Sequence, residues 1–203
     1  NRRGAALSKE AAGTRARVFA SMGPSGKMLM MGEVSEDDLA AAFAEQASAL
    51  AEGGADGIVV ETMADLEEAL LAIRAAKSTG LPVVGCMVYD SGADKDRTMM
   101  GVAPEQQAAA FVEAGVDVIG ANCGQGIEGF IELARRLKAA SGLPVWVKAN
   151  AGLPESVGGQ MVYPTTPEAF AEGAREACQA GATFTGGCCG TSPEFIAVLK
   201  ASR

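Results

Sequence analysis

Gly54-Ala55-Asp56-Gly57-Ile58-Val59-Val60 recurs farther along the chain as Gly115-Val116-Asp117-Val118-Ile119-Gly120. A third copy, Gly181-Ala182-Thr183-Phe184-Thr185-Gly186, follows at a similar distance beyond the second. Another motif, Gly80-Leu81-Pro82-Val83-Val84, returns at nearly the same offset as Gly142-Leu143-Pro144-Val145-Trp146. Each copy sets a glycine that ends a helix in front of an apolar strand, so one period holds two βα units. Repetition of paired units favours a closed (β/α) barrel over an open doubly wound sheet.

Short β-branched runs alternate with Ala- and Glu-rich helical stretches, which is typical of βα units that feed a parallel sheet. Ser35 and Thr166 are the expected helix caps, because acidic residues or proline follow each of them. The sequence predicts six strands, at residues 18–22, 57–61, 83–87, 116–122, 145–149 and 183–187. An eight-unit barrel needs about 250 residues. We therefore expect residues 1–203 to form one α/β domain, a (β/α)8 TIM barrel that lacks its first βα units.

The composition excludes several kinds of site. The chain has no histidine, which removes Ser-His-Asp and Cys-His nucleophile systems and every zinc site with a histidine ligand. A net charge of −8 without a Lys/Arg cluster argues against a nucleic-acid partner. No apolar run is long enough for a membrane span, and no signal-peptide core is visible. With an odd number of cysteines, five, we expect reduced thiols and a cytoplasmic protein.

Two adjacent cysteines stand among glycines after the last predicted strand, in Gly186-Gly187-Cys188-Cys189-Gly190-Thr191-Ser192-Pro193. Cys123 follows another apolar strand, earlier in the chain. In a parallel barrel these thiols converge, because functional groups gather at the carboxyl ends of the strands. Zinc prefers four ligands, so three thiolates leave one position open to a substrate atom. The pattern predicts a Zn²⁺ site at Cys123, Cys188 and Cys189, and the plainer alternatives are buried small side chains or a vicinal disulfide.

Five motifs carry a resemblance to a known family. They are Ser21-Met22-Gly23-Pro24, Val60-Glu61-Thr62, Gly120-Ala121-Asn122-Cys123-Gly124, Asn150-Ala151-Gly152-Leu153-Pro154 and the highly specific stretch from Gly186 to Pro193. Across nearly the whole chain the sequence resembles the homocysteine S-methyltransferase family of zinc-thiolate barrels. The resemblance implies that the three cysteines hold zinc and that Glu61 binds the amino group of homocysteine. Asn150 offers an amide donor and acceptor to a bound amino acid or to neighbouring loops.

The resemblance also implies a reaction, the zinc-dependent transfer of a methyl group to the thiol of homocysteine, which forms methionine. Only a few per cent of a free thiol with a pKa near 8.5 is thiolate at neutral pH, and zinc coordination removes that handicap. The methyl donor stays open among betaine, S-methylmethionine, S-adenosylmethionine and a methylated corrinoid or folate. Additional folate or cobalamin domains, or a homo-oligomer, are the partners to be considered.

Other interpretations remain at this point. An aldolase-type barrel would use the Gly186-Gly187 turn to cradle a phosphate and Lys148 as its strand-end lysine. A non-catalytic zinc-binding or redox-sensing remnant would fit the missing first units. Glu61 could simply stabilise the amino-terminal end of the helix that follows it. Cys86 and Cys178 are expected to be packing residues.

Overall fold

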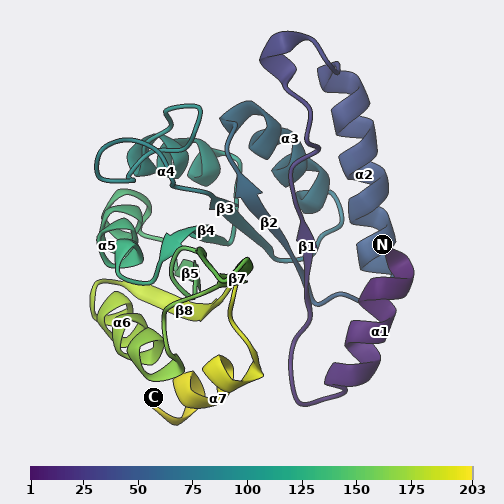
Figure 1. Cartoon of the computed structure of the whole chain (residues 1–203). Coiled ribbons are helices and arrows are strands. Elements are labelled where there is room, and N and C mark those ends of the chain that lie inside the picture. Colours follow the sequence, from purple (N-terminus) through teal and green to yellow (C-terminus); the bar gives the residue numbers. More distant parts are fainter. Residues whose placement is uncertain (203) are drawn as a thin grey trace.

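The computed structural model describes residues 1–202, in which six parallel strands form one curled sheet with helices along its outer face (Figure 1). The strands are β1 (Phe19–Met22), β2 (Gly57–Met63), β3 (Val83–Met87), β4 (Val118–Gly126), β5 (Val145–Asn150) and β8 (Ala182–Gly187). Their order is β1-β2-β3-β4-β5-β8, so β1 and β8 are the two edges of the sheet. The predicted α/β class and six-unit portion of a (β/α)8 barrel are confirmed, and the result is a half-barrel.

Residues 1–202 contain seven α-helices and one short 3₁₀ helix. They are α1 (Arg2–Ala12), η1 (Leu29–Met31), α2 (Glu36–Glu52), α3 (Leu66–Lys77), α4 (Pro104–Glu113), α5 (Gly129–Ser141), α6 (Pro167–Gln179) and α7 (Pro193–Ala201). Both predicted caps are present, because the side chains of Ser35 and Thr166 accept hydrogen bonds from the backbone N–H groups of Asp38 and Ala169. Across these residues, every helix is too short or too polar to traverse a bilayer.

The core has two layers, because successive side chains of a strand point to opposite faces of the sheet. Ile58 and Val60 on β2 face outward and join the large cluster under the helices. Val59 faces inward, where it packs in a smaller cluster with Val84 and Cys86. The inward layer also takes in the partly buried side chains of Phe19, Val118 and Trp146. The strands therefore present a mainly apolar inner face. It lies below the mouth of the half-barrel, by which we mean the end where the carboxyl ends of the strands lie.

The structure departs from the sequence predictions at several elements. β2 and β4 run past their predicted ends, because Thr62 and Cys123 adopt left-handed backbone angles, φ 65° and 60°, that bulge each strand without ending it. Helix α1 was not expected. The same holds for a hairpin formed by β6 (Glu155–Val157) and β7 (Gln160–Val162). The packing role expected for Cys178 is wrong, since its side chain is exposed on α6, whereas Cys86 is fully buried as expected.

Candidate metal centre

Three cysteine sulfurs meet at the mouth of the half-barrel. The Sγ atoms of Cys123, Cys188 and Cys189 all lie within 4.8 Å of one another. The Cys123 and Cys189 sulfurs are 3.8 Å apart. Tetrahedral thiolates at about 2.3 Å from a zinc ion are separated by about 3.8 Å. The structure thus brings together the residues that the sequence singled out, at a spacing and with a donor set that fit a shared thiophilic ion.

The backbone leaves strand geometry directly at the two adjacent cysteines. The Cys188 N–H donates to the Ala149 carbonyl at 2.7 Å, which keeps this residue in register with β5. The next N–H, that of Cys189, donates instead to the side-chain oxygen of Asn150 at 3.1 Å. Gly190 then takes a left-handed turn with φ 80°. This turn lets consecutive side chains share one site, which a regular strand would prevent.

Cys123 lies at a strained position. A non-glycine residue with positive φ costs about 1–3 kcal/mol and persists where the surroundings hold it in place. Gly124 is left-handed too, with φ 75°, and a Cβ atom there would come within 2.9 Å of the Tyr89 carbonyl. The close approach of these backbones therefore fixes the bulge that turns Cys123 toward the other two thiols.

The three cysteine side chains have different pKa values, because each sulfur affects the others. The Cys188 thiol donates to the Cys123 sulfur, and this hydrogen bond is the main reason that the pKa of Cys123 falls to about 5. The same bond, together with burial, raises the pKa of Cys188 far above its usual range. Burial first, and then the Cys123 sulfur, also raise the pKa of Cys189. The cluster therefore favours the thiolate form at Cys123 and the thiol form at Cys188 and Cys189.

Two asparagines support the strand ends around the sulfurs. Asn122 is 1% exposed. Its amide oxygen accepts a hydrogen bond from the Thr62 backbone N–H, and its Nδ2 atom donates one to the Thr62 hydroxyl, both at 2.7 Å. Its Nδ2 atom is also 4.0 Å from the Cys188 sulfur. Asn150, 5% exposed, directs its amide oxygen to the cysteine turn. Of the two contacts expected for Asn150, the structure contains the one to a neighbouring loop.

Glu61 faces the inside of the half-barrel. Its carboxylate accepts a hydrogen bond from the Ser21 hydroxyl at 2.8 Å and one from Lys148 Nζ at 2.7 Å. The cap of the helix that follows is Asp65, whose carboxylate accepts from the backbone N–H groups of Glu67 and Glu68. Glu61 therefore does not serve as the cap of α3. Sequence reasoning missed Ser21 and Lys148 as its partners, although the alternation along β5 places Lys148 on the same face as Trp146.

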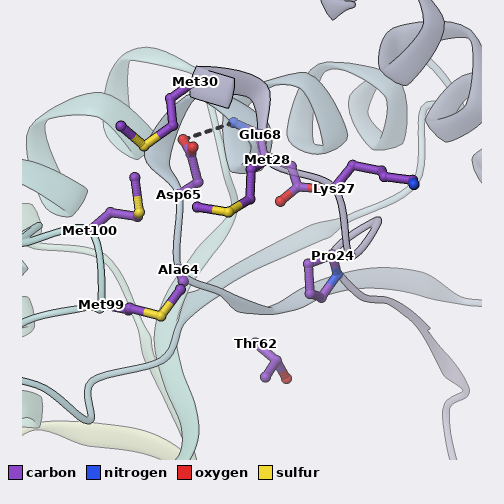
Figure 2. A pocket seen from close by; sticks show the side chains of 11 residues that line it. Pro24, Lys27, Met28, Met30, Thr62, Ala64, Asp65, Glu68, Met99 and Met100 are labelled. Atoms are coloured by element: carbon purple, nitrogen blue, oxygen red, sulfur yellow. Dashed lines mark hydrogen bonds between the residues drawn. The ribbon is translucent and has the colours of Figure 1, made fainter. Parts of the chain in front are cut away.

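A pocket of about 250 Å³ opens beside this mouth, between the loops that follow β1, β2 and β3 (Figure 2). Its walls include four thioether side chains, those of Met28, Met30, Met99 and Met100. Thr62, which bonds to Asn122, also lines the pocket. Two acidic residues, Asp65 and Glu68, and the basic Lys27 also line it. Glu68 is 5% exposed, and its carboxylate accepts a hydrogen bond from the Ser25 N–H at 2.7 Å. Such a lining suits an apolar or cationic part of a small molecule.

A family model identifies the family of this chain, and sequence relatives and solved structures add to the comparison. Residues 1–202 match the family model described as homocysteine S-methyltransferase. The methionine synthases of Mycobacterium leprae and Mycobacterium tuberculosis are 33% and 32% identical to this chain over 189 residues, or 91% of it. The chain spans 16% of the length of each of those proteins. The crystal structure of the apo homocysteine methyltransferase MmuM from Escherichia coli superposes with a TM-score of 0.74 at 23% identity. That alignment covers 99% of this chain and 68% of the other, and it supports the barrel fold.

Proposed function

We propose, since the chain belongs to the homocysteine S-methyltransferase family, that it binds homocysteine through its sulfur and receives a methyl group there, which forms methionine. The observation that carries this proposal is the group of three thiols within 4.8 Å at the mouth of the half-barrel. Three protein ligands leave a fourth position for an incoming thiol, as in catalytic rather than structural zinc sites. The site needs no histidine, which this chain lacks.

The proposed metal is Zn²⁺, held by Cys123, Cys188 and Cys189. When bound, zinc would acidify the homocysteine thiol and hold its sulfur as a thiolate at neutral pH. The protein residues would do the remaining work. The bulge at Cys123 and the turn at Gly190 aim the sulfurs, and Asn122 and Asn150 hold those two segments. We assign Glu61 to the amino group of homocysteine, because its side chain is only 12% exposed and faces the inside of the half-barrel.

The donor side of the reaction involves other parts of the molecule. The methionine-lined pocket adjoins Thr62, and through Asn122 it is one hydrogen-bonded step from the cysteine cluster. We propose that this rim contacts the methyl donor. The two methionine synthases are much longer than this chain, so further domains that carry a folate or corrinoid donor belong to the same proposal. A cytoplasmic location would keep the thiols reduced.

The aldolase-type alternative is less well supported. A lysine that forms a Schiff base must lose its proton to attack a carbonyl group. Burial by itself would lower the pKa of Lys148, but the hydrogen bond to Glu61 and the nearby negative charge together outweigh this effect and raise the pKa. The amine therefore stays protonated beside its carboxylate partner. An aldolase-type enzyme would also explain neither the family match nor the clustering of the three cysteines.

The proposed activity can be tested with the zinc-loaded chain, homocysteine and each candidate donor in turn, with methionine measured by mass spectrometry. We expect methionine with at least one donor, and loss of its formation in Cys188→Ser. The matched control is Cys178→Ser, because Cys178 is an exposed thiol on α6 outside the cluster. Equal methionine formation by Cys188→Ser and the unsubstituted chain would contradict the proposal. Zinc and homocysteine binding without any turnover would instead favour the non-catalytic remnant.

A further inference from the structure

An ion pair crosses the concave face of the sheet just below the sulfurs. Lys148 on β5 and Glu61 on β2 are separated by two intervening strands, yet their Nζ and Oε2 atoms are 2.7 Å apart. Both side chains are largely buried, with exposed fractions of 24% and 12%. Apart from the Ser21 hydroxyl that bonds to Glu61, the inner layer of these strands is mainly apolar and includes Val59, Cys86 and Trp146. Charged groups there lose hydration, and an apolar pair of similar volume is often no less stable. Packing alone therefore gives no reason for this pair.

The strand register places Lys148 close to the candidate metal centre. It pairs with Asn122 on β4, the residue before Cys123. On its other side it pairs with Gly186 on β8, two residues before Cys188. In homocysteine, two methylene groups separate the sulfur from the carbon that bears the ammonium and carboxylate groups. A homocysteine whose sulfur lies at the cysteine cluster can thus bring its charged end to the level of Lys148 and Glu61.

The charges of the pair favour a zwitterion over a simple amine. An ammonium group added beside Glu61 would share that carboxylate with Lys148 and leave one positive charge in excess. An α-amino acid adds a carboxylate as well, so that positive and negative groups alternate around the site. Such interactions are stronger in a partly buried position than in bulk water. A lysine ammonium has three donors and an ionised carboxylate has about four acceptor positions, so both groups retain capacity for a ligand.

From this geometry we propose that Lys148 binds the α-carboxylate of homocysteine while Glu61 binds its α-ammonium group. Lys148 is then a specificity-determining residue that restricts the site to α-amino acid thiols. Ser21 keeps the Glu61 carboxylate in place through its 2.8 Å hydrogen bond. The inference rests on the proposed function, because it assumes that a thiol substrate binds at the cysteine cluster.

The test compares homocysteine with 3-mercaptopropylamine, which is the same molecule without its carboxylate. Binding of each thiol to the zinc-loaded chain is measured by calorimetry, for the unsubstituted protein, Lys148→Met and Lys148→Arg. A hydrogen bond to a charged group is worth about 1.5–3 kcal/mol, so we expect Lys148→Met to weaken homocysteine binding about 10- to 100-fold. Binding of 3-mercaptopropylamine should not weaken and is expected to tighten, because Lys148→Met removes the positive charge that competes with its ammonium group for Glu61. Lys148→Arg, which keeps the charge, should recover part of the preference for homocysteine.

Three outcomes would overturn the inference. Equal weakening of both thiols in Lys148→Met would mean that Lys148 acts only by positioning Glu61. Unchanged binding of both thiols would mean that it has no part in recognition. If the unsubstituted zinc-loaded chain bound neither thiol, the proposed function would fail and this inference with it. Circular dichroism and zinc content check each variant, and Lys148→Gln replaces Lys148→Met if the latter does not fold.

Discussion

Thr62 and Asn122 exchange two hydrogen bonds of 2.7 Å that join the end of β2 to the residue directly before Cys123. The two strands are not neighbours, because β3 lies between them. One amide side chain therefore satisfies the backbone N–H of a left-handed residue and holds the bulge that carries a candidate ligand. The link also connects the methionine-lined pocket with the cysteine cluster.

Asn122→Ala should destabilise the protein and loosen the metal site together. It leaves the partly buried Thr62 N–H without its partner, at a cost of about 1–3 kcal/mol. It also frees the strand end at Cys123, so we expect zinc affinity to fall by about 10- to 100-fold, as for other changes around metal ligands. Chemical denaturation and competition with a chelator measure the two effects. Thr62→Val, which keeps the backbone N–H and its bond, is the control and should do less on both counts.

Gly190→Ala should reduce zinc affinity through the position of Cys189. A Cβ atom at residue 190 would overlap the ring of Tyr163, so the turn that bends Cys189 toward the other sulfurs must shift. Gly142→Ala is a matched control, because its φ of 70° is also left-handed but nothing lies within 4 Å of the added carbon. Both variants should lose about 1 kcal/mol of stability from the backbone angle. Equal zinc affinities in the two variants would speak against this role for the turn.

Zinc uptake near pH 7 should release about two protons rather than three. The hydrogen bond from Cys188 lowers the pKa of Cys123, which favours the thiolate form of this residue before zinc binds. The raised pKa values of Cys188 and Cys189 keep both of them protonated until the metal displaces the protons. Zinc affinity should accordingly rise with pH over the neutral range. Calorimetry in buffers of different ionisation enthalpy counts the protons, and a value of three would show that Cys123 is protonated in the metal-free site.

Asp56→Asn should remove part of the pH dependence of stability in acid. Lys9 at 2.6 Å is the main cause that lowers the pKa of Asp56 from 3.8 to about 2, and the Val18 N–H at 2.8 Å adds to it. Because the pKa is lower in the folded state, this carboxylate stabilises the protein above about pH 4, and the contribution disappears as the pH falls toward 2. Denaturation midpoints between pH 2 and 7 should show a shallower loss in the variant. Glu45→Gln, at an exposed position on α2, should leave the profile unchanged.

The six parallel strands were predictable because glycine-led repeats mark where each helix gives way to a strand. Gly54, Gly115 and Gly181 all take positive φ values before β2, β4 and β8. The extensions of β2 and β4 were not predictable from propensity, because Thr62 and Cys123 adopt left-handed angles that their residue types disfavour. The β6–β7 hairpin has a local signal in the Gly158-Gly159 pair, a typical two-residue hairpin turn, but the flanking segment Glu155-Ser156-Val157 is too polar to predict a strand.

The convergence of the cysteines was predictable from the position of each one at a strand end, since parallel strands of one barrel bring those ends together. The partners of Glu61 were not. Lys148 lies 87 residues away in sequence, on a strand that is not adjacent to β2. The curvature of the sheet brings the two side chains together, and no local pattern in the sequence specifies that curvature.

The most direct test of the central claim is X-ray absorption at the zinc K-edge of the loaded chain, before and after addition of homocysteine. The account predicts three sulfur neighbours at about 2.3 Å and one lighter atom before addition, and four sulfur neighbours afterwards. Cys178→Ser should give the same pair of spectra, whereas Cys188→Ser should lose a sulfur neighbour from both. A sulfur count that homocysteine leaves unchanged, or that Cys188→Ser leaves unchanged, would contradict it.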